Sequence, residues 1–281
     1  MFENIHGLSC IENQVLAILR ERGEPVEYTY NNSAVPLSEL YARLVTEGIK
    51  QEYFNAIPRV QDALKELGVI SLELNKDENK TRLKSALQSC QENEYILMMT
   101  NPNYEASGTS ITRFRRDHYV RMQIQQKKYI LINDIPEAQY AVAPGQLLKM
   151  YGGNFFKMTV KKPIDGDVIQ ILWDNRSCTP AESAFSEVFT EDFDFTEETV
   201  RRLRDMAGVC KILRRRMADY YGKYTDTGFI QGLIPEYERF HSTLEYYRLK
   251  PKTAADKIRT LMLDLFDLDN GIMAELKGRW D

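Results

Sequence analysis

A cysteine near the start of the sequence lies where thiol chemistry is expected. Ser9 is followed three residues later by Glu12, which predicts a capping box at a helix start, with Cys10 as the first residue of a helix over 10–22. Free backbone N–H groups and the positive end of the helix dipole gather there, which predicts a lowered thiol pKa and a nucleophilic thiolate. The same amides could hold an oxyanion as a thioester carbonyl is attacked. The alternative is that Cys10 is a small buried apolar residue.

A cysteine nucleophile needs a base, and His118 begins the clearest predicted β-hairpin, residues 118–134. Asn133 and Asp134 end its second strand, where an amide or a carboxylate could orient the imidazole. The apolar even positions of both strands favour Asp134 on the face of His118, whereas a two-residue turn would favour Asn133. We therefore expect Cys10, His118 and Asp134 to be catalytic, with Asn133 as the alternative third residue or a substrate contact. A hydrogen-bonded structural role is the alternative for His118.

Five further side chains are candidates for contacts with the substrate. Asn4 precedes the nucleophile by six residues, where an amide could help an oxyanion hole, and His6 lies between them. Arg113, Arg115 and Arg116 come just before the expected base, where a basic rim would suit an acidic carrier protein and its phosphopantetheine phosphate. The alternatives are structural roles for Asn4 and His6 and a charge-guarded strand edge for the arginines.

The composition excludes several classes of protein. With 281 residues, 43% hydrophobic and 28% charged, the chain has the composition of a globular protein. Its formal charge of −4 argues against a nucleic-acid footprint. The four cysteines form no CxxC pair and the three histidines form no HxxxH pair, so no metal site is expected. Neither a signal peptide nor a membrane span is evident, which favours a cytoplasmic protein with reduced thiols.

Strand patterns occur only in the first 175 residues, where they alternate with helical ones. The predicted strands are Val69–Leu74, Tyr95–Thr100, the hairpin 118–134, Phe155–Val160 and Val168–Trp173. The predicted helices are 10–22, 37–47, Pro58–Leu67, a polar stretch between the first two strands, and then 195–221, Pro235–Leu249 and 252–277. The sequence thus predicts an α/β (α+β) protein, with a papain-like catalytic domain over 1–175 and a mostly helical C-terminal domain over 176–281.

Three short motifs resemble the N-terminal domain of butirosin biosynthesis protein H, over roughly residues 1–175. The motifs are Gly7-Leu8-Ser9-Cys10, Asp117-His118-Tyr119-Val120 and Ile132-Asn133-Asp134-Ile135-Pro136. The resemblance implies a papain-like acyltransferase of nonribosomal peptide, polyketide or siderophore pathways. It implies Cys10 as nucleophile, His118 as base and Asp134 as the residue that orients the base. Members of that family often have a histidine directly before the nucleophile, where this chain has Ser9.

Three function classes follow from these residues. The first is an acyltransferase that takes an acyl group from a carrier-protein thioester onto Cys10 and passes it to an amine, forming an amide. The second is a cysteine peptidase or amidase with the same three residues, and the third is a papain-like binding protein with an inert thiol. We expect an acyl or peptidyl carrier protein and a small amine as partners, without nucleic acid or membrane. No cofactor is expected beyond the phosphopantetheine that delivers the acyl group.

Overall fold

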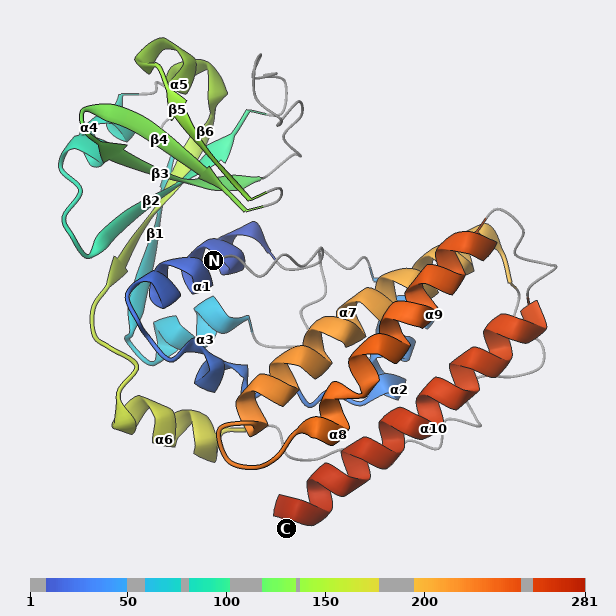
Figure 1. The fold of residues 1–281 in the computed structure, drawn as a ribbon. Helices are drawn as coiled ribbons and strands as arrows, with labels where there is room; N and C mark the ends of the chain where they lie inside the picture. The colour runs from blue at the N-terminus through green and yellow to red at the C-terminus, as the bar shows by residue number, and fades with distance from the viewer. Residues whose placement is uncertain are drawn as a thin grey trace. The chain divides into compact units, whose positions relative to one another are not determined.

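The chain packs as two compact units. The computed structural model describes residues 9–49, 59–76, 81–101, 118–134, 137–176, 195–248 and 255–280. The first unit comprises Met1–Val26 and Arg59–Val168, and the second comprises Glu27–Pro58 and Ile169–Asp281. The expected mixed α/β class is confirmed, because one unit holds a sheet and the other holds helices. Figure 1 labels the helices and strands of both units.

The first unit is built on a six-stranded sheet in the order β1-β6-β2-β3-β4-β5, with every neighbouring pair antiparallel. The strands are β1 (Ile70–Lys76), β2 (Glu94–Thr100), β3 (Tyr119–Gln125), β4 (Lys128–Asn133), β5 (Ala138–Val142) and β6 (Tyr151–Val160). Each was predicted in place except β5, a short strand without a strong apolar alternation. Side chains of alternate parity on the central strands face two different layers of helices.

Helices cover the two faces of this sheet (Figure 1). On one face, α4 (Arg82–Gln88) and α5 (Pro144–Met150) enclose an apolar core with β2, β3, β4, β5 and β6. Val120 and Met122 of β3 and Leu131 of β4 belong to that core. On the other face lies α1 (Cys10–Glu21), whose Ala17 packs against Ile132. A further helix of the first unit, α3 (Val60–Glu66), contacts β1.

The predicted β3–β4 hairpin is confirmed, with a two-residue turn. Gln125 pairs with Lys128, and Gln126 and Lys127 between them have φ values of 47° and 63°. Positive φ at both central residues is the requirement of a type I′ turn, which matches the twist of the flanking strands. The resulting register pairs each residue of β3 with a residue of opposite parity in β4, from Gln125 opposite Lys128 to Arg121 opposite Ile132.

The prediction of a strand at Val168–Trp173 is wrong, because this segment is a helix, α6 (Gly166–Asp174). Val168 and Leu172 are buried but Gln170 between them is exposed, so burial recurs every four residues rather than every two, which is helical rather than strand periodicity. Asp165 begins the helix, since its Oδ1 accepts a hydrogen bond from the backbone N–H of Val168 at 3.1 Å. A short apolar run such as this one fits the periodicity of a strand and of a helix equally well.

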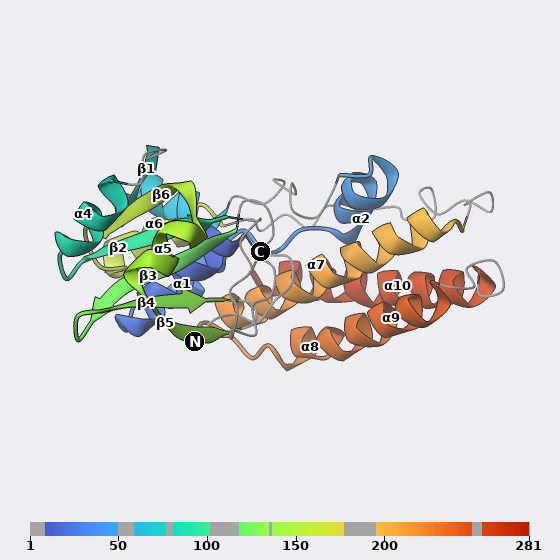
Figure 2. The same cartoon turned by 90° about the horizontal axis from the view of Figure 1, so that it is seen from above.

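The second unit is helical in the residues that the structure describes. It holds α2 (Leu37–Tyr41), the π-helical turn η2 (Ala42–Thr46), α7 (Glu197–Tyr221), α8 (Gly228–Gln231), α9 (Leu233–Tyr247) and α10 (Ala255–Trp280), with the 3₁₀ turn η1 (Val26–Tyr30) at its first boundary. The long helices α7, α9 and α10 run alongside one another in two perpendicular views (Figure 2). The expected helices over 37–47, 195–221, 235–249 and 252–277 are confirmed to within a few residues.

A buried ion pair links two helices of the second unit. Arg214 of α7 donates from Nε and Nη2 to the two carboxylate oxygens of Asp269 in α10, both at 2.7 Å, and neither side chain is exposed. Arg214 Nη2 also donates to the carbonyl of Val35 at 2.9 Å, and the Tyr237 hydroxyl of α9 donates to Asp269 at 3.0 Å. The segment around Val35 therefore packs with the C-terminal helices. The predicted domain boundary near residue 175 stays a prediction.

Within the described ranges, none of the helices combines the length and the apolar character that crossing a bilayer requires.

Replacing Arg214 by Met should reduce the free energy of unfolding by about 3–5 kcal/mol, because it leaves the Asp269 carboxylate buried without its partner. Arg215→Met is the matched control, since the neighbouring Arg215 pairs with Glu238 at 2.9 Å on the surface, where both side chains are more than 40% exposed. That pair should contribute less than about 1 kcal/mol. Urea unfolding of both variants measures the difference. Equal losses would contradict the role of the buried pair.

Candidate active site

The expected helix start at Cys10 is confirmed, but the predicted capping box is wrong. Ser9 has the extended backbone of an N-cap residue, with φ of −58° and ψ of 132°, yet its side chain makes no capping hydrogen bond. The Glu12 side chain, expected to reach back to the cap, is buried instead. Cys10 therefore lies in the first turn with its neighbouring backbone N–H groups directed near the thiol, as expected.

Polar contacts fix α1 on the β3–β4 hairpin. The Gln14 side chain donates from Nε2 to the carbonyl oxygen of Ile132 at 3.1 Å. Arg121, which is only 3% exposed, donates from both terminal nitrogens to the two carboxylate oxygens of Glu21 at 2.7 Å. Bidentate pairs of this kind hold both the distance and the angle between two elements. The helix therefore docks in one orientation on the strands.

This docking brings the Cys10 thiol to Tyr119, the residue that directly follows the expected base His118. The backbone N–H of Tyr119 donates to Cys10 Sγ at 3.3 Å, although the two residues are 109 positions apart in sequence. Tyr119 directly follows His118. The thiol therefore lies at the start of β3, and the roles of Cys10 as nucleophile and His118 as base stay predictions.

Asn133 is the nearer of the two candidates for orienting His118. His118 Nε2 lies 2.7 Å from Asn133 Oδ1 and 3.7 Å from Asp134 Oδ1. Because an amide oxygen only accepts, Nε2 carries the hydrogen, and in the neutral imidazole Nδ1 keeps a lone pair that can take a proton. This geometry corrects the expected preference for Asp134, although a catalytic role for either residue stays a prediction.

The hairpin register explains the correction. The two-residue turn places even-numbered residues of β3 on the same face as odd-numbered residues of β4. Continued past Arg121 and Ile132, this register gives His118 and Asn133 the same parity of face. Asp134 follows the end of β4 and is directed toward α1, where its Oδ2 accepts from Asn13 Nδ2 at 3.1 Å. Asp134 is buried at 2% exposure, so it contributes a charge beside the site rather than a substrate contact.

The pKa of the Cys10 thiol is raised to about 11, which contradicts the expected lowering. Burial of the sulfur is the largest cause, because a desolvated thiolate is less stable than a thiol. The hydrogen bond from the Tyr119 backbone lowers the pKa, and the negative charge of Asp134 raises it further. At neutral pH the resting thiol is therefore protonated, and any nucleophilic attack requires a base to remove the proton as the new bond forms.

The other cysteines are less suited to nucleophilic chemistry. Burial raises the pKa of the Cys210 thiol to about 12, and this side chain has no exposed surface. Cys90 donates from its thiol to the carbonyl of Glu94 at 3.0 Å, and burial raises its pKa as well. Cys178 lies outside the described residues. Of the three described cysteines, Cys10 is the one whose sulfur accepts a hydrogen bond from the residue that follows His118 in the chain.

The expected substrate contacts Asn4, His6, Arg113, Arg115 and Arg116 lie outside the described residues. The structure adds two polar residues that the sequence did not single out, Asn13 and Gln14, both buried in α1. Gln14 lies four positions after Cys10 and four before Ile18, on the face already assigned to the core. A polar residue within an otherwise apolar helix face is the feature of the sequence that could have pointed to Gln14.

No group of three or more His, Cys, Asp or Glu side chains suited to a metal ion occurs in the described parts of the chain.

A search against models of protein families gave no match, and a search of curated proteins found no relative of this chain. The functional argument therefore depends on the site residues and their geometry.

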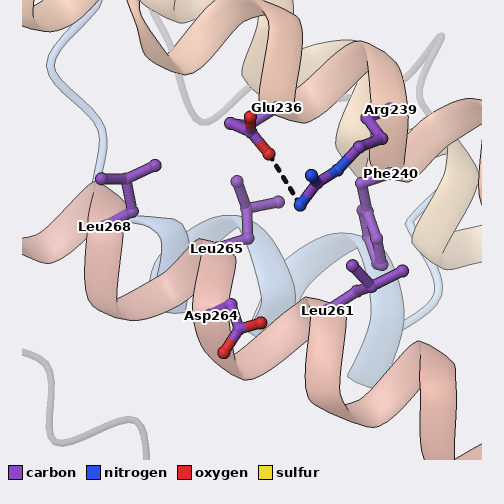
Figure 3. Close-up of a pocket in the computed structure, with 7 residues that line it drawn as sticks. All are labelled: Glu236, Arg239, Phe240, Leu261, Asp264, Leu265 and Leu268. Atoms are coloured by element: carbon purple, nitrogen blue, oxygen red, sulfur yellow. Dashed lines mark ion pairs between the residues drawn. The ribbon is translucent and has the colours of Figure 1, made fainter.

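The second unit has a separate groove between α9 and α10 (Figure 3). Its cavity volume is about 250 Å³, and its apolar walls are Phe240, Leu261, Leu265 and Leu268. Glu236 and Arg239 form an ion pair of 2.9 Å at its edge, and Asp264 adds a second carboxylate to its lining. The residues that line this groove include none of the catalytic candidates.

Alkylation of Cys10 by iodoacetamide should accelerate with pH from 7 to 10 without a plateau, by roughly tenfold per pH unit, because the thiolate fraction grows until the pKa is reached. The pKa is raised, so the thiol form is the one that persists through neutral pH. Peptide mapping at several pH values measures the rate at Cys10, with buried Cys210 as the slow internal control. A rate that levels off below pH 8 would contradict the raised pKa.

Proposed function

We propose that this chain is a cysteine acyltransferase that passes an acyl group from a carrier-protein thioester to an amine, with Cys10 as nucleophile. The observation that carries the proposal is the pair of contacts at the start of β3. Tyr119 N–H meets the Cys10 sulfur at 3.3 Å, and the preceding residue, His118, is hydrogen-bonded to Asn133 at 2.7 Å. A thiol at a helix start, an imidazole and an orienting amide are the parts of a cysteine acyl-transfer site.

In the first half-reaction, Cys10 Sγ attacks the thioester carbonyl carbon while His118 Nδ1 takes the thiol proton. The oxyanion that forms is stabilised by the backbone N–H groups at the start of α1, those of Cys10 and Ile11. Collapse breaks the carbon–sulfur bond to the donor, whose thiolate receives the proton from His118. The products are an acyl-enzyme on Cys10 and a free carrier thiol.

In the second half-reaction, the nitrogen of an amine attacks the same carbonyl carbon, and His118 accepts the proton that the amine loses. The carbon–sulfur bond to Cys10 then breaks, and the proton passes to the leaving sulfur. An amide and the original thiol are formed. Because the buried thiol has a raised pKa, proton transfer through His118 serves each half-reaction.

The finer assignment of the fold is also part of the proposal. A papain-like domain places the nucleophilic cysteine at the start of a helix that packs on an antiparallel sheet, and α1 and the β3–β4 hairpin have that relation. The resemblance of the motifs around Cys10, His118 and Asn133 to the butirosin biosynthesis protein H domain favours a thioester donor and an amine acceptor. The basic residues Arg113 and Arg115 would suit an acidic carrier. A cytoplasmic location stays a prediction.

A cysteine hydrolase is the second candidate, because the observed amide at Asn133 gives the Cys–His–Asn set that papain-like proteases use. Water would then attack the acyl-enzyme in place of the amine. The two functions share Cys10, His118 and Asn133 and differ in the second nucleophile. The ratio of amide to free acid formed from one acyl thioester distinguishes them.

Replacing Asn133 by Ala should lower kcat/KM for amide formation by about 10²-fold, because His118 loses the acceptor that fixes its ring and tautomer. Asp134→Asn is the matched control, since it keeps the shape and removes only a charge that lies 3.7 Å from the imidazole. It should keep activity within about tenfold of wild type. The assay is chromatographic detection of amide from an acyl thioester and an amine. An inactive Asp134→Asn with an active Asn133→Ala would contradict this assignment.

A further inference from the structure

The peptide group between His118 and Tyr119 is held at both of its edges. Its N–H, on Tyr119, donates to Cys10 Sγ at 3.3 Å. Its carbonyl oxygen, on His118, accepts two hydrogen bonds from Thr100, one from the backbone N–H at 2.8 Å and one from Oγ1 at 3.1 Å. A trans peptide is planar, and its C=O and N–H point in opposite directions. One rigid group therefore connects Thr100 to the thiol.

Thr100 is itself fixed from its other side. It is the last residue of β2, it has no exposed surface, and it pairs with Tyr151 of β6 at a register shift in the sheet. The next residue of β6 is Gly152, where an added Cβ would lie 2.7 Å from the carbonyl oxygen of Thr100. The glycine thus permits a close backbone approach that packs Thr100 tightly between two strands.

We propose that Thr100 is a positioning residue that acts through the His118–Tyr119 peptide to set the reactivity of Cys10. The two hydrogen bonds that the His118 carbonyl accepts polarise the peptide, which makes the opposite N–H a stronger donor to the sulfur. They also fix the plane in which that N–H points. Because the His118 carbonyl belongs to the same peptide, Thr100 also holds the backbone from which the imidazole extends. The role rests on the proposed function of Cys10.

The hydrogen bond from the Tyr119 N–H acts to lower the pKa of the Cys10 thiol. Among the groups that act on Cys10, this hydrogen bond is the largest that favours the thiolate, against burial and the charge of Asp134. The titratable side chain that acts on the thiol is Asp134, and it is not changed by substitution at Thr100. A weaker hydrogen bond from the Tyr119 N–H would therefore mainly reduce the fraction of Cys10 that is present as thiolate at a given pH.

The test is the rate of Cys10 alkylation by iodoacetamide from pH 7 to 10 in Thr100→Val, which removes the hydroxyl and keeps the backbone hydrogen bond. We expect the rate to fall by about two- to fivefold at each pH, the scale of one lost hydrogen bond. Thr100→Ser, which keeps the hydroxyl, should restore it. Ser33→Ala is a matched control, since it removes a buried hydroxyl that donates to the Tyr30 carbonyl at 2.7 Å in the second unit. It should leave the rate unchanged.

Measuring Thr100→Val in a His118→Ala background shows whether Thr100 acts through the peptide or through the imidazole. If Thr100 acts through the peptide, the fall in rate persists without the imidazole. A fall that disappears in that background, or a Thr100→Val rate equal to wild type, would overturn the proposal. Alkylation needs no acyl donor, so this outcome is distinct from failure of the proposed acyl transfer, which would appear as a wild-type protein that alkylates at Cys10 but forms no acyl-enzyme.

Discussion

The docking of α1 on the β3–β4 hairpin is the constraint on which the candidate site depends. Cys10 begins the helix and His118 precedes the strand, so neither element alone brings thiol and imidazole together. Arg121 and Glu21 fix one end of the contact with two hydrogen bonds, and Gln14 binds the backbone of the hairpin between them and the thiol. Because these hydrogen bonds all cross the same interface, a shift of the helix would break several of them at once. The interface therefore specifies the position of the sulfur.

The same interface also makes the thiolate form of Cys10 less stable. Packing the helix start against the sheet removes water from Cys10 and raises its pKa, and buried Asp134 adds a negative charge nearby. The Tyr119 N–H and the backbone at the helix start act against these effects. A neutral resting thiol needs a base, and in the proposed mechanism the His118 imidazole takes the proton as the carbon–sulfur bond forms. Such a site is less exposed to side reactions of a free thiolate.

The strongly periodic elements could be predicted from sequence, and the details of the site could not. The helix at Cys10 and the hairpin after His118 follow from apolar periodicity, but the Gln126-Lys127 turn lacks the Asn-Gly or Asp-Gly pair that usually marks a two-residue loop. Without the turn length, the choice between Asn133 and Asp134 stayed open, because one residue of register changes the face. The thiol pKa was expected to follow the helix dipole, yet it depends on burial, which arises from tertiary packing.

The most direct measurement of the central claim is the intact mass of the protein after incubation with an acylated carrier protein in the absence of amine. The account predicts a mass gain equal to the acyl group, located on the peptide that contains Cys10, and its release as an amide when an amine is added. His118→Ala should lack the gain while keeping the wild-type unfolding transition. A protein that alkylates at Cys10 but shows no acyl mass with carrier or with a small acyl thioester would contradict the account.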